Sequence, residues 1–179
     1  MKLRYTTLSL ACVTTIVCGG SAFAQVLTSG NLVVERFGTG AAALSSASTA
    51  VFLDQYSTTG TLGTGIVMPT TGATQLTNSG TATSEGLITV SPNGLFLNSA
   101  GYNTTTGTAA VNGTTSAVNN RVVNLIGADG TITRGGTTST AFSGGNIRSA
   151  ISNGADVWAT GSTTGTVYLG SGTAAEERI

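Results

Sequence analysis

The sequence predicts an all-β protein made of short antiparallel strands. Short runs of apolar and β-branched residues recur along the chain, and Gly, Asn, Ser or Pro bounds each run. Helical patterning is almost absent. The best helix candidate, residues 41–50, carries several Ser and Thr and lacks an apolar stripe at helical spacing, so we interpret it as a loop.

The predicted strands follow one another at short intervals. They are residues 32–37, 51–56, 65–68, 87–90, 95–100, 121–126, 131–133, 157–159 and 166–169. Turns at 91–94, 128–130 and 152–154 contain Asn-Gly or Asp-Gly, which tolerate the positive φ of tight hairpins. Several strands place apolar groups on both faces, whereas the strands of a two-layer sandwich keep one wet face. We therefore expect each sheet to be covered by like sheets on both sides.

An internal repeat points to a β-propeller, whose blades are packed between neighbouring blades. Residues 86–101 align without gaps on 146–161, and both Gly94 and Gly101 have counterparts 60 residues later. This period exceeds the roughly 40–50 residues of common blades, and Thr/Gly-rich insertions account for the excess. We predict antiparallel four-stranded blades in a partial propeller of about two and a half blades, where a ring needs about four. Such a chain looks truncated, and we expect it to self-associate through its open sheet edges.

The first 24 residues predict a signal peptide. Lys2 and Arg4 precede a short apolar run at 8–17, and Ala22-Phe23-Ala24 supplies a cleavage site. The apolar run is shorter than the roughly 20 residues that cross a bilayer, and no later run is long enough. The mature chain, residues 25–179, is therefore predicted to be one propeller-like domain without a transmembrane helix. We expect it to be secreted, periplasmic or on the cell surface.

The composition excludes several chemistries. The chain has no His, and cleavage of the signal peptide removes its one Lys and both Cys, leaving five basic and seven acidic residues. Ser-His-Asp and Cys-His catalysis, Schiff bases and imidazole or thiolate metal sites therefore lack their groups. Five scattered Arg form no basic stripe for nucleic acid. We expect no cofactor, no resident metal and no nucleic-acid partner. Carboxylate chemistry, hard cations and recognition by hydroxyl or aromatic groups remain open.

Two charged residues are the first site candidates. Glu85 precedes the strand that would be innermost in its blade, so its carboxylate could face the mouth of a central channel. Arg148 lies within the equivalent strand of the next blade. Together they could bind a sugar or an organic acid, and Glu85 is the candidate catalytic residue. The simpler interpretation is a structural ion pair or two solvated side chains.

Other carboxylates and the aromatic residues give weaker candidates. Paired carboxylates would suggest glycoside hydrolysis, and edge charges that oppose aggregation are the alternative. The three that lie in or beside strands are Glu35, Asp54 and Asp156. Aromatic residues could form a sugar-stacking platform or pack between blades. These are Tyr102 and Trp158, our candidates for ligand binding, with Tyr56 and Tyr168.

Three stretches, beginning at Gly30 (GNLVVERFGTG), Gly80 (GTATSEGLITVSPNG) and Ala141 (AFSGGNIRSAISNG), resemble a family of exported bacterial proteins. That family has propeller-like repeats and no known function, and some members carry a C-terminal surface-sorting segment. The resemblance covers most of the mature chain up to about Leu169, and members are about twice as long, which implies that this chain ends before a ring could close. The resemblance brings no catalytic or binding residues with it.

The first functional hypothesis is a secreted or cell-surface protein with a non-catalytic binding, adhesion or scaffolding role toward an extracellular ligand or envelope component. The alternative is a propeller enzyme that hydrolyses a carbohydrate or lactone through carboxylates, with Glu85 as the main candidate. The third is a Thr-rich β-solenoid that binds ice or a polymer. A solenoid predicts short coils with Thr in register, but the visible period is far longer.

Overall fold

A computed structural model describes residues 25–170 and 177–178. This part of the chain consists of antiparallel strands and one short 3-10 helix, η1 (Val111–Gly113). The all-β prediction is confirmed, and residues 41–47 form no helix. The predicted signal peptide lies outside the described residues.

The strands fall close to their predicted places. They are β1 (Leu32–Phe37), β2 (Ser48–Tyr56), β3 (Ile66–Val67), β4 (Thr77–Ser79), β5 (Thr89–Val90), β6 (Phe96–Tyr102), β7 (Arg121–Gly127), β8 (Ile132–Thr138), β9 (Ile147–Ser152), β10 (Val157–Gly161), β11 (Gly165–Tyr168) and β12 (Glu177–Arg178). The sequence missed β4 because its three residues are polar and show no alternation, although all three are buried. It also began β2 three residues late, at the end of the segment that we interpreted as a loop.

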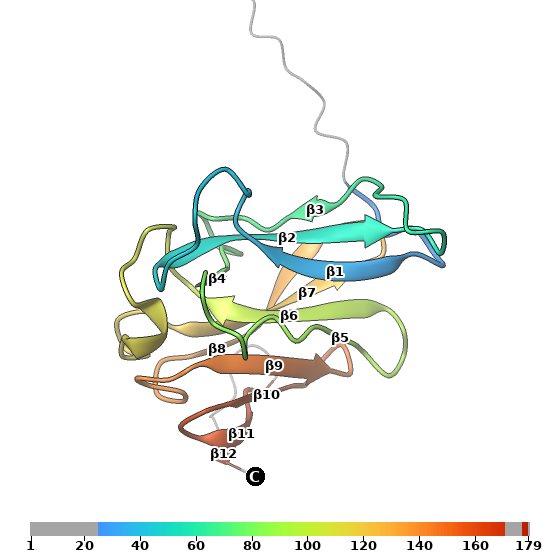
Figure 1. The fold of residues 1–179 in the computed structure, drawn as a ribbon. Helices are drawn as coiled ribbons and strands as arrows, with labels where there is room; N and C mark the ends of the chain where they lie inside the picture. The colour runs from blue at the N-terminus through green and yellow to red at the C-terminus, as the bar shows by residue number, and fades with distance from the viewer. Residues whose placement is uncertain (1–24, 171–176, 179) are drawn as a thin grey trace, which may run out of the picture.

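The strands form two antiparallel sheets. The larger has the order β1-β2-β4-β6-β7-β8, with β3 on β2 and β5 on β6; the smaller has the order β12-β11-β10-β9. The larger sheet divides along β2, because residues 48–50 pair with β4 while residues 51–56 pair with β1. The result is three stacked layers (Figure 1): a first layer of β1–β3, a middle layer of β5–β8 and a third layer of β9–β12.

Two apolar cores separate the layers. The core between the first and middle layers contains Val51, Leu53, Ile66, Met68, Leu76, Leu97, Val122 and Ile126. The core between the middle and third layers contains Tyr102, Val123, Leu125, Phe142, Ile147, Val157, Val167, Leu169 and several smaller residues. Alternation along β7 sends Val122 and Ile126 to one core and Val123 and Leu125 to the other. The middle layer is therefore covered on both faces, as expected. The described layers close no barrel or ring, so the propeller and its blade count stay a prediction.

The two hairpins aligned in the sequence are β5–β6 and β9–β10. Their turn glycines both have positive φ, 71° at Gly94 and 102° at Gly154. Where the layers meet, the segment around β5 runs parallel to β9 through a bridge between Leu87 and Ser149. The Thr89 hydroxyl donates to the carbonyl of Ala150 at 2.6 Å. The two hairpins thus lie side by side, and their first strands run in the same direction.

Candidate functional site

Glu85 lies in the interior rather than at an open mouth. It is only 7% exposed. Its carboxylate accepts hydrogen bonds from the Tyr102 hydroxyl at 2.6 Å, the Ser79 backbone N–H at 2.9 Å and the Asn146 amide at 2.8 Å. It therefore joins β4, β6 and the residue before β9, holding the middle and third layers together.

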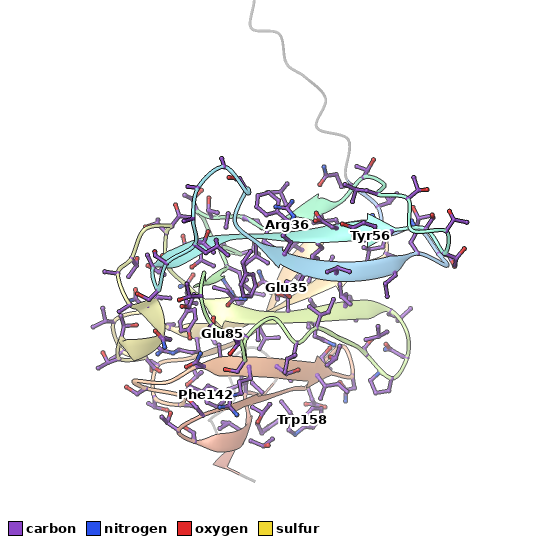
Figure 2. The ribbon with its side chains drawn as sticks, viewed as in Figure 1. Glu35, Arg36, Tyr56, Glu85, Phe142 and Trp158 are labelled. Atoms are coloured by element: carbon purple, nitrogen blue, oxygen red, sulfur yellow. The ribbon has the colours of Figure 1, made fainter. Side chains whose placement is uncertain are left out.

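Glu35 is a second interior carboxyl, on the other side of the middle layer. It is half-buried on β1, on the face turned toward β6 (Figure 2). The Asn78 amide donates to it at 3.0 Å and the Ser99 hydroxyl at 3.2 Å. Asn78 and Ser79 are neighbours on β4, so one short strand supplies a donor to Glu35 and another to Glu85.

Burial dominates the electrostatics of both carboxyls. It raises the pKa of Glu35 to about 7, against the hydrogen bonds from Ser99 and Asn78, and the nearby charge of Glu85 raises it further. Burial also raises the pKa of Glu85, although its hydrogen bonds and the charge of Arg121 oppose this. Two interior carboxyls with raised pKa values, one of them raised in part by the charge of the other, are a feature of acid-base sites as well as of structural networks.

Arg121 supplies the positive charge of this interior network. It is fully buried at the start of β7. Its guanidinium donates to the carbonyls of Asn119 at 2.7 Å, Asn112 at 3.1 Å, Thr114 at 2.7 Å and Gly145 at 3.1 Å. It also lies over the Tyr102 ring, 4.8 Å from the centroid. Burial lowers the pKa of Arg121, while Tyr102 and Glu85 raise it. This role could not be predicted from the sequence, because a single Arg at a strand end forms no recognisable pattern.

The three ligand-binding candidates do not converge. Tyr102 is fully buried, and its hydroxyl donates a hydrogen bond to the Glu85 carboxylate. Arg148 is exposed on β9, and no ion pair with Glu85 is found among residues 25–170. Trp158 is half-buried on β10, on the outer surface of the third layer.

We call this outer surface of β9–β11 the tail face. Cross-strand pairing puts Trp158 opposite Tyr168 and Ile151, and Thr160 opposite Thr166. The Trp158 and Tyr168 rings are 5.5 Å apart at a tilt of 41°. A hollow of about 320 Å³, lined by Trp158, Ile151, Thr160, Thr166, Ser149 and Thr89 among others, opens on this face.

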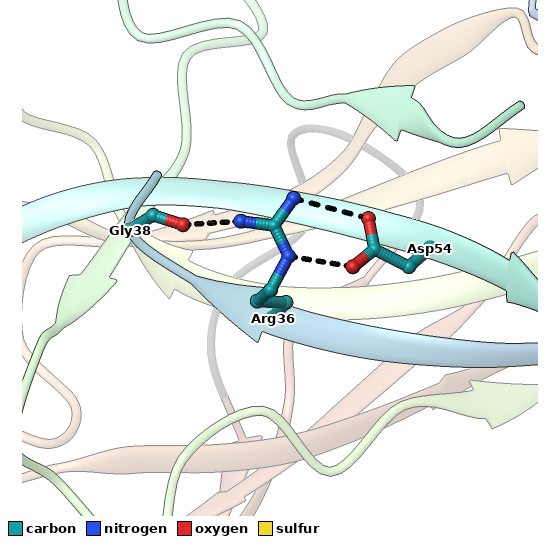
Figure 3. Close-up of polar contacts among 3 residues, drawn as sticks. All are labelled: Arg36, Gly38 and Asp54. Carbon is teal, nitrogen blue, oxygen red and sulfur yellow. Dashed lines mark hydrogen bonds and ion pairs between the residues drawn. The ribbon is translucent and has the colours of Figure 1, made fainter. Parts of the chain in front are cut away.

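The outer surface of β1–β3 is the corresponding head face. Its residues are Leu32, Val34, Arg36, Phe52, Asp54, Tyr56 and Val67, which the pairing of β1, β2 and β3 places on one side. Arg36 Nε donates to Asp54 Oδ2 at 2.5 Å and Nη2 to Oδ1 at 3.2 Å, while Nη1 donates to the Gly38 carbonyl (Figure 3). The Arg36 guanidinium also stacks 4.3 Å from the centre of the Phe52 ring. The hydrogen bonds with Asp54 raise the pKa of Arg36.

The three carboxylates considered for glycoside hydrolysis lie apart. Glu35 points into the stack and Asp54 pairs with Arg36 on the head face. Asp156 sits in the β9–β10 turn, where it accepts from the Asn153 amide at 2.9 Å and the Tyr168 hydroxyl at 2.7 Å. The carboxyl that does lie near Glu35 is Glu85, a pairing that sequence spacing does not reveal.

Within the described ranges, no group of three or more His, Cys, Asp or Glu side chains is placed to hold a metal ion. Over the same ranges, no helix has both the length and the apolar character to cross a membrane. No family model, no curated protein and no solved structure matches the chain.

Proposed function

We propose that this chain is an exported binding or scaffolding protein that works without catalysis, through the head and tail faces of its stacked layers. One observation carries the proposal. The two interior carboxyls, Glu35 and Glu85, are engaged in interior hydrogen bonds, whereas apolar and aromatic side chains lie at least partly exposed on both outer faces. Glu85 has three donors and little solvent contact, as expected of a structural network.

The outer faces have the character of interaction surfaces. On the head face Leu32 is 65% exposed, Val67 53% and Val34 41%. On the tail face Ile151 is 41% exposed beside Trp158 and Tyr168. Apolar residues that gather on one face, unlike single exposed apolar residues, are typical of sites where another molecule docks.

The test of the proposal measures turnover and binding together. Purified protein and a Glu85→Gln variant are incubated with a panel of soluble glycans and lactones, and both are co-sedimented with insoluble polysaccharides. We expect no turnover by either protein. Any retention on a polysaccharide should be lost in Trp158→Ala and kept in Val118→Ala, because Val118 is 75% exposed on a loop away from both faces.

The second candidate function is hydrolysis by the carboxyls of Glu35 and Glu85. Two observations favour it: burial raises the pKa of both carboxyls, and the charge of Glu85 raises the pKa of Glu35 further. Turnover by the native protein that Glu85→Gln abolishes, with an unchanged thermal melt, would establish this function and refute the non-catalytic one. The antiparallel pairing of the strands gives no support to the solenoid hypothesis.

A further inference from the structure

We propose that the head face of one copy of this chain docks on the tail face of a second copy, so that the stacking of layers continues from molecule to molecule. The inference rests on the proposed function, because it assigns a partner to the same two faces. It differs from the edge pairing expected from the sequence, since the contact is made by side chains across sheet faces.

The alignment of the two repeated hairpins indicates that the tail face corresponds to a surface that another layer covers elsewhere in the molecule. With a 60-residue offset, Asn98 and Ala100 of β6 correspond to Trp158 and Thr160 of β10. Asn98 and Ala100 are buried, and they face the third layer: Ala100 belongs to its core, and Asn98 accepts from the Ser152 hydroxyl at 2.6 Å. The residues of β10 that take their places are turned outward, and no further layer among the described residues lies over them.

The correspondence also holds on the faces that are turned toward the preceding layer. Leu97 of β6 faces the first layer, and its counterpart Val157 of β10 faces the middle layer. Each layer therefore offers one face to the layer before it and a different face to the layer after it. The head face is the side of the first layer that would meet a preceding layer, and nothing in the described chain covers it. The head face therefore corresponds to a surface that meets a preceding layer, and the tail face corresponds to a surface that meets a following layer. The two faces are complementary in this sense.

The chemistry of the two faces suits burial against each other. The tail face offers an apolar and hydroxyl-rich hollow around Trp158. The head face offers Leu32, Val34 and Val67, which protrude. Its two charges, Arg36 and Asp54, already neutralise each other through two hydrogen bonds. Docking would therefore bury apolar area without leaving an unpaired charge, which is the costly outcome at interfaces.

Two different surfaces in contact make a heterologous interface, which produces either a closed ring or an open series of copies. The experiment compares two face variants and their mixture by light scattering and sedimentation velocity over a dilution series. Val34→Lys blocks the head face and Ile151→Lys blocks the tail face; both are partly exposed positions, so the fold should survive. Val118→Lys, on a distant loop, is the matched control.

The native protein and Val118→Lys should show a mass that rises with concentration above the 17.7 kDa of the full-length monomer. Each face variant alone should weaken self-association by about tenfold or more. An equimolar mixture of the two should form a discrete heterodimer, because one variant keeps its tail face and the other keeps its head face. Both carry an added Lys, so no new ion pair can cause their pairing.

Three results would overturn the inference. One is a native protein that stays monomeric throughout the series, which would leave the two faces to a partner of different chemistry. Another is loss of association in only one of the two face variants, which indicates contact between like faces. The third is a mixture that fails to pair although circular dichroism shows both variants folded. None of these results bears on turnover, so the proposed non-catalytic function stands or falls separately.

Discussion

The hairpins β5–β6 and β9–β10 have corresponding sequences but different surroundings, and the contrast shows what layer stacking does to a strand. Asn98 of β6 is fully buried, and its amide and carbonyl oxygen bond to Thr89 and Ser152. Trp158, its counterpart on β10, is half-buried on a face that no other described layer covers. The middle layer therefore derives stability from both faces and the third layer from one. The predictions below compare covered and uncovered positions, from the largest expected effect to the smallest.

The largest effect is expected for Arg121→Ala. This change removes a buried guanidinium and its hydrogen bonds to four carbonyls, three of which have no other donor within the described part of the chain. It also removes the positive charge that offsets Glu85. Loss of one member of a buried charge network costs about 3–5 kcal/mol. Urea unfolding should show this loss. Arg148→Ala, at an exposed position of β9, should change stability by less than about 0.5 kcal/mol. Equal costs at the two sites would contradict the buried network.

Truncation of an apolar side chain should lower the free energy of unfolding more on a covered face than on an uncovered one. Ile126 is fully buried in the core between the first and middle layers, whereas Ile151 is 41% exposed on the tail face. Ile126→Ala should lower the free energy of unfolding by about 2–4 kcal/mol. Ile151→Ala should cost less than about 1 kcal/mol when measured in solutions dilute enough to keep the protein monomeric. A large cost at Ile151 in the monomer would mean that the tail face is already covered within the chain.

The glycines of the β5–β6 hairpin offer a test of close packing. A Cβ on Gly101 would lie 2.7 Å from the Thr77 carbonyl oxygen and 2.8 Å from Leu76 Cγ, because β4 approaches β6 closely there. Gly101→Ala should therefore cost about 2–3 kcal/mol by overpacking. Gly94 has open space around it, so Gly94→Ala pays only for its φ of 71°, about 1–2 kcal/mol. Thermal melts of the two variants provide the comparison.

The smallest predicted effect is a pH dependence that arises in the interior and not on the faces. Burial raises the pKa of Glu35 from its ordinary value of 4.5 to about 7 in the folded protein. Between these values the folded state holds a proton that the unfolded state has released, so stability should fall as pH rises from about 4.5 to about 7. Because Glu35 is only half-buried, we expect a loss of about 1–2 kcal/mol.

Glu35→Gln should remove most of this slope while keeping an acceptor for Asn78 and Ser99. A smaller slope of the same sign should remain, because burial raises the pKa of Glu85 as well. Asp156→Asn is the control: hydrogen bonds from Tyr168 and Asn153 lower the pKa of this carboxyl, so it does not contribute to the slope between pH 4.5 and 7. A stability that rises with pH over this range would contradict the burial of Glu35.

Local residues specified much of the fold and little of the site. Each predicted strand has a counterpart because apolar runs bounded by Gly, Asn or Pro are local signals, as in the Leu-Phe-Leu run of β6 and the turn at Gly94. β4 has no such signal, since Thr77, Asn78 and Ser79 are buried through hydrogen bonds rather than apolar contact. That strand supplies the donors for Glu35 and Glu85, so the interior carboxyl network could not be predicted without it.

The amino-acid sequence by itself determined the positions of most strands, the tight turns and the two-sided apolar character of the middle strands, because these depend on side-chain alternation and on glycines that accept positive φ. Only the tertiary structure decided which faces are covered. It brought Glu35 near Glu85 and turned Trp158 outward, because burial and long-range hydrogen bonds depend on which layer lies on which. A strand carries the same local pattern whether or not another layer covers it.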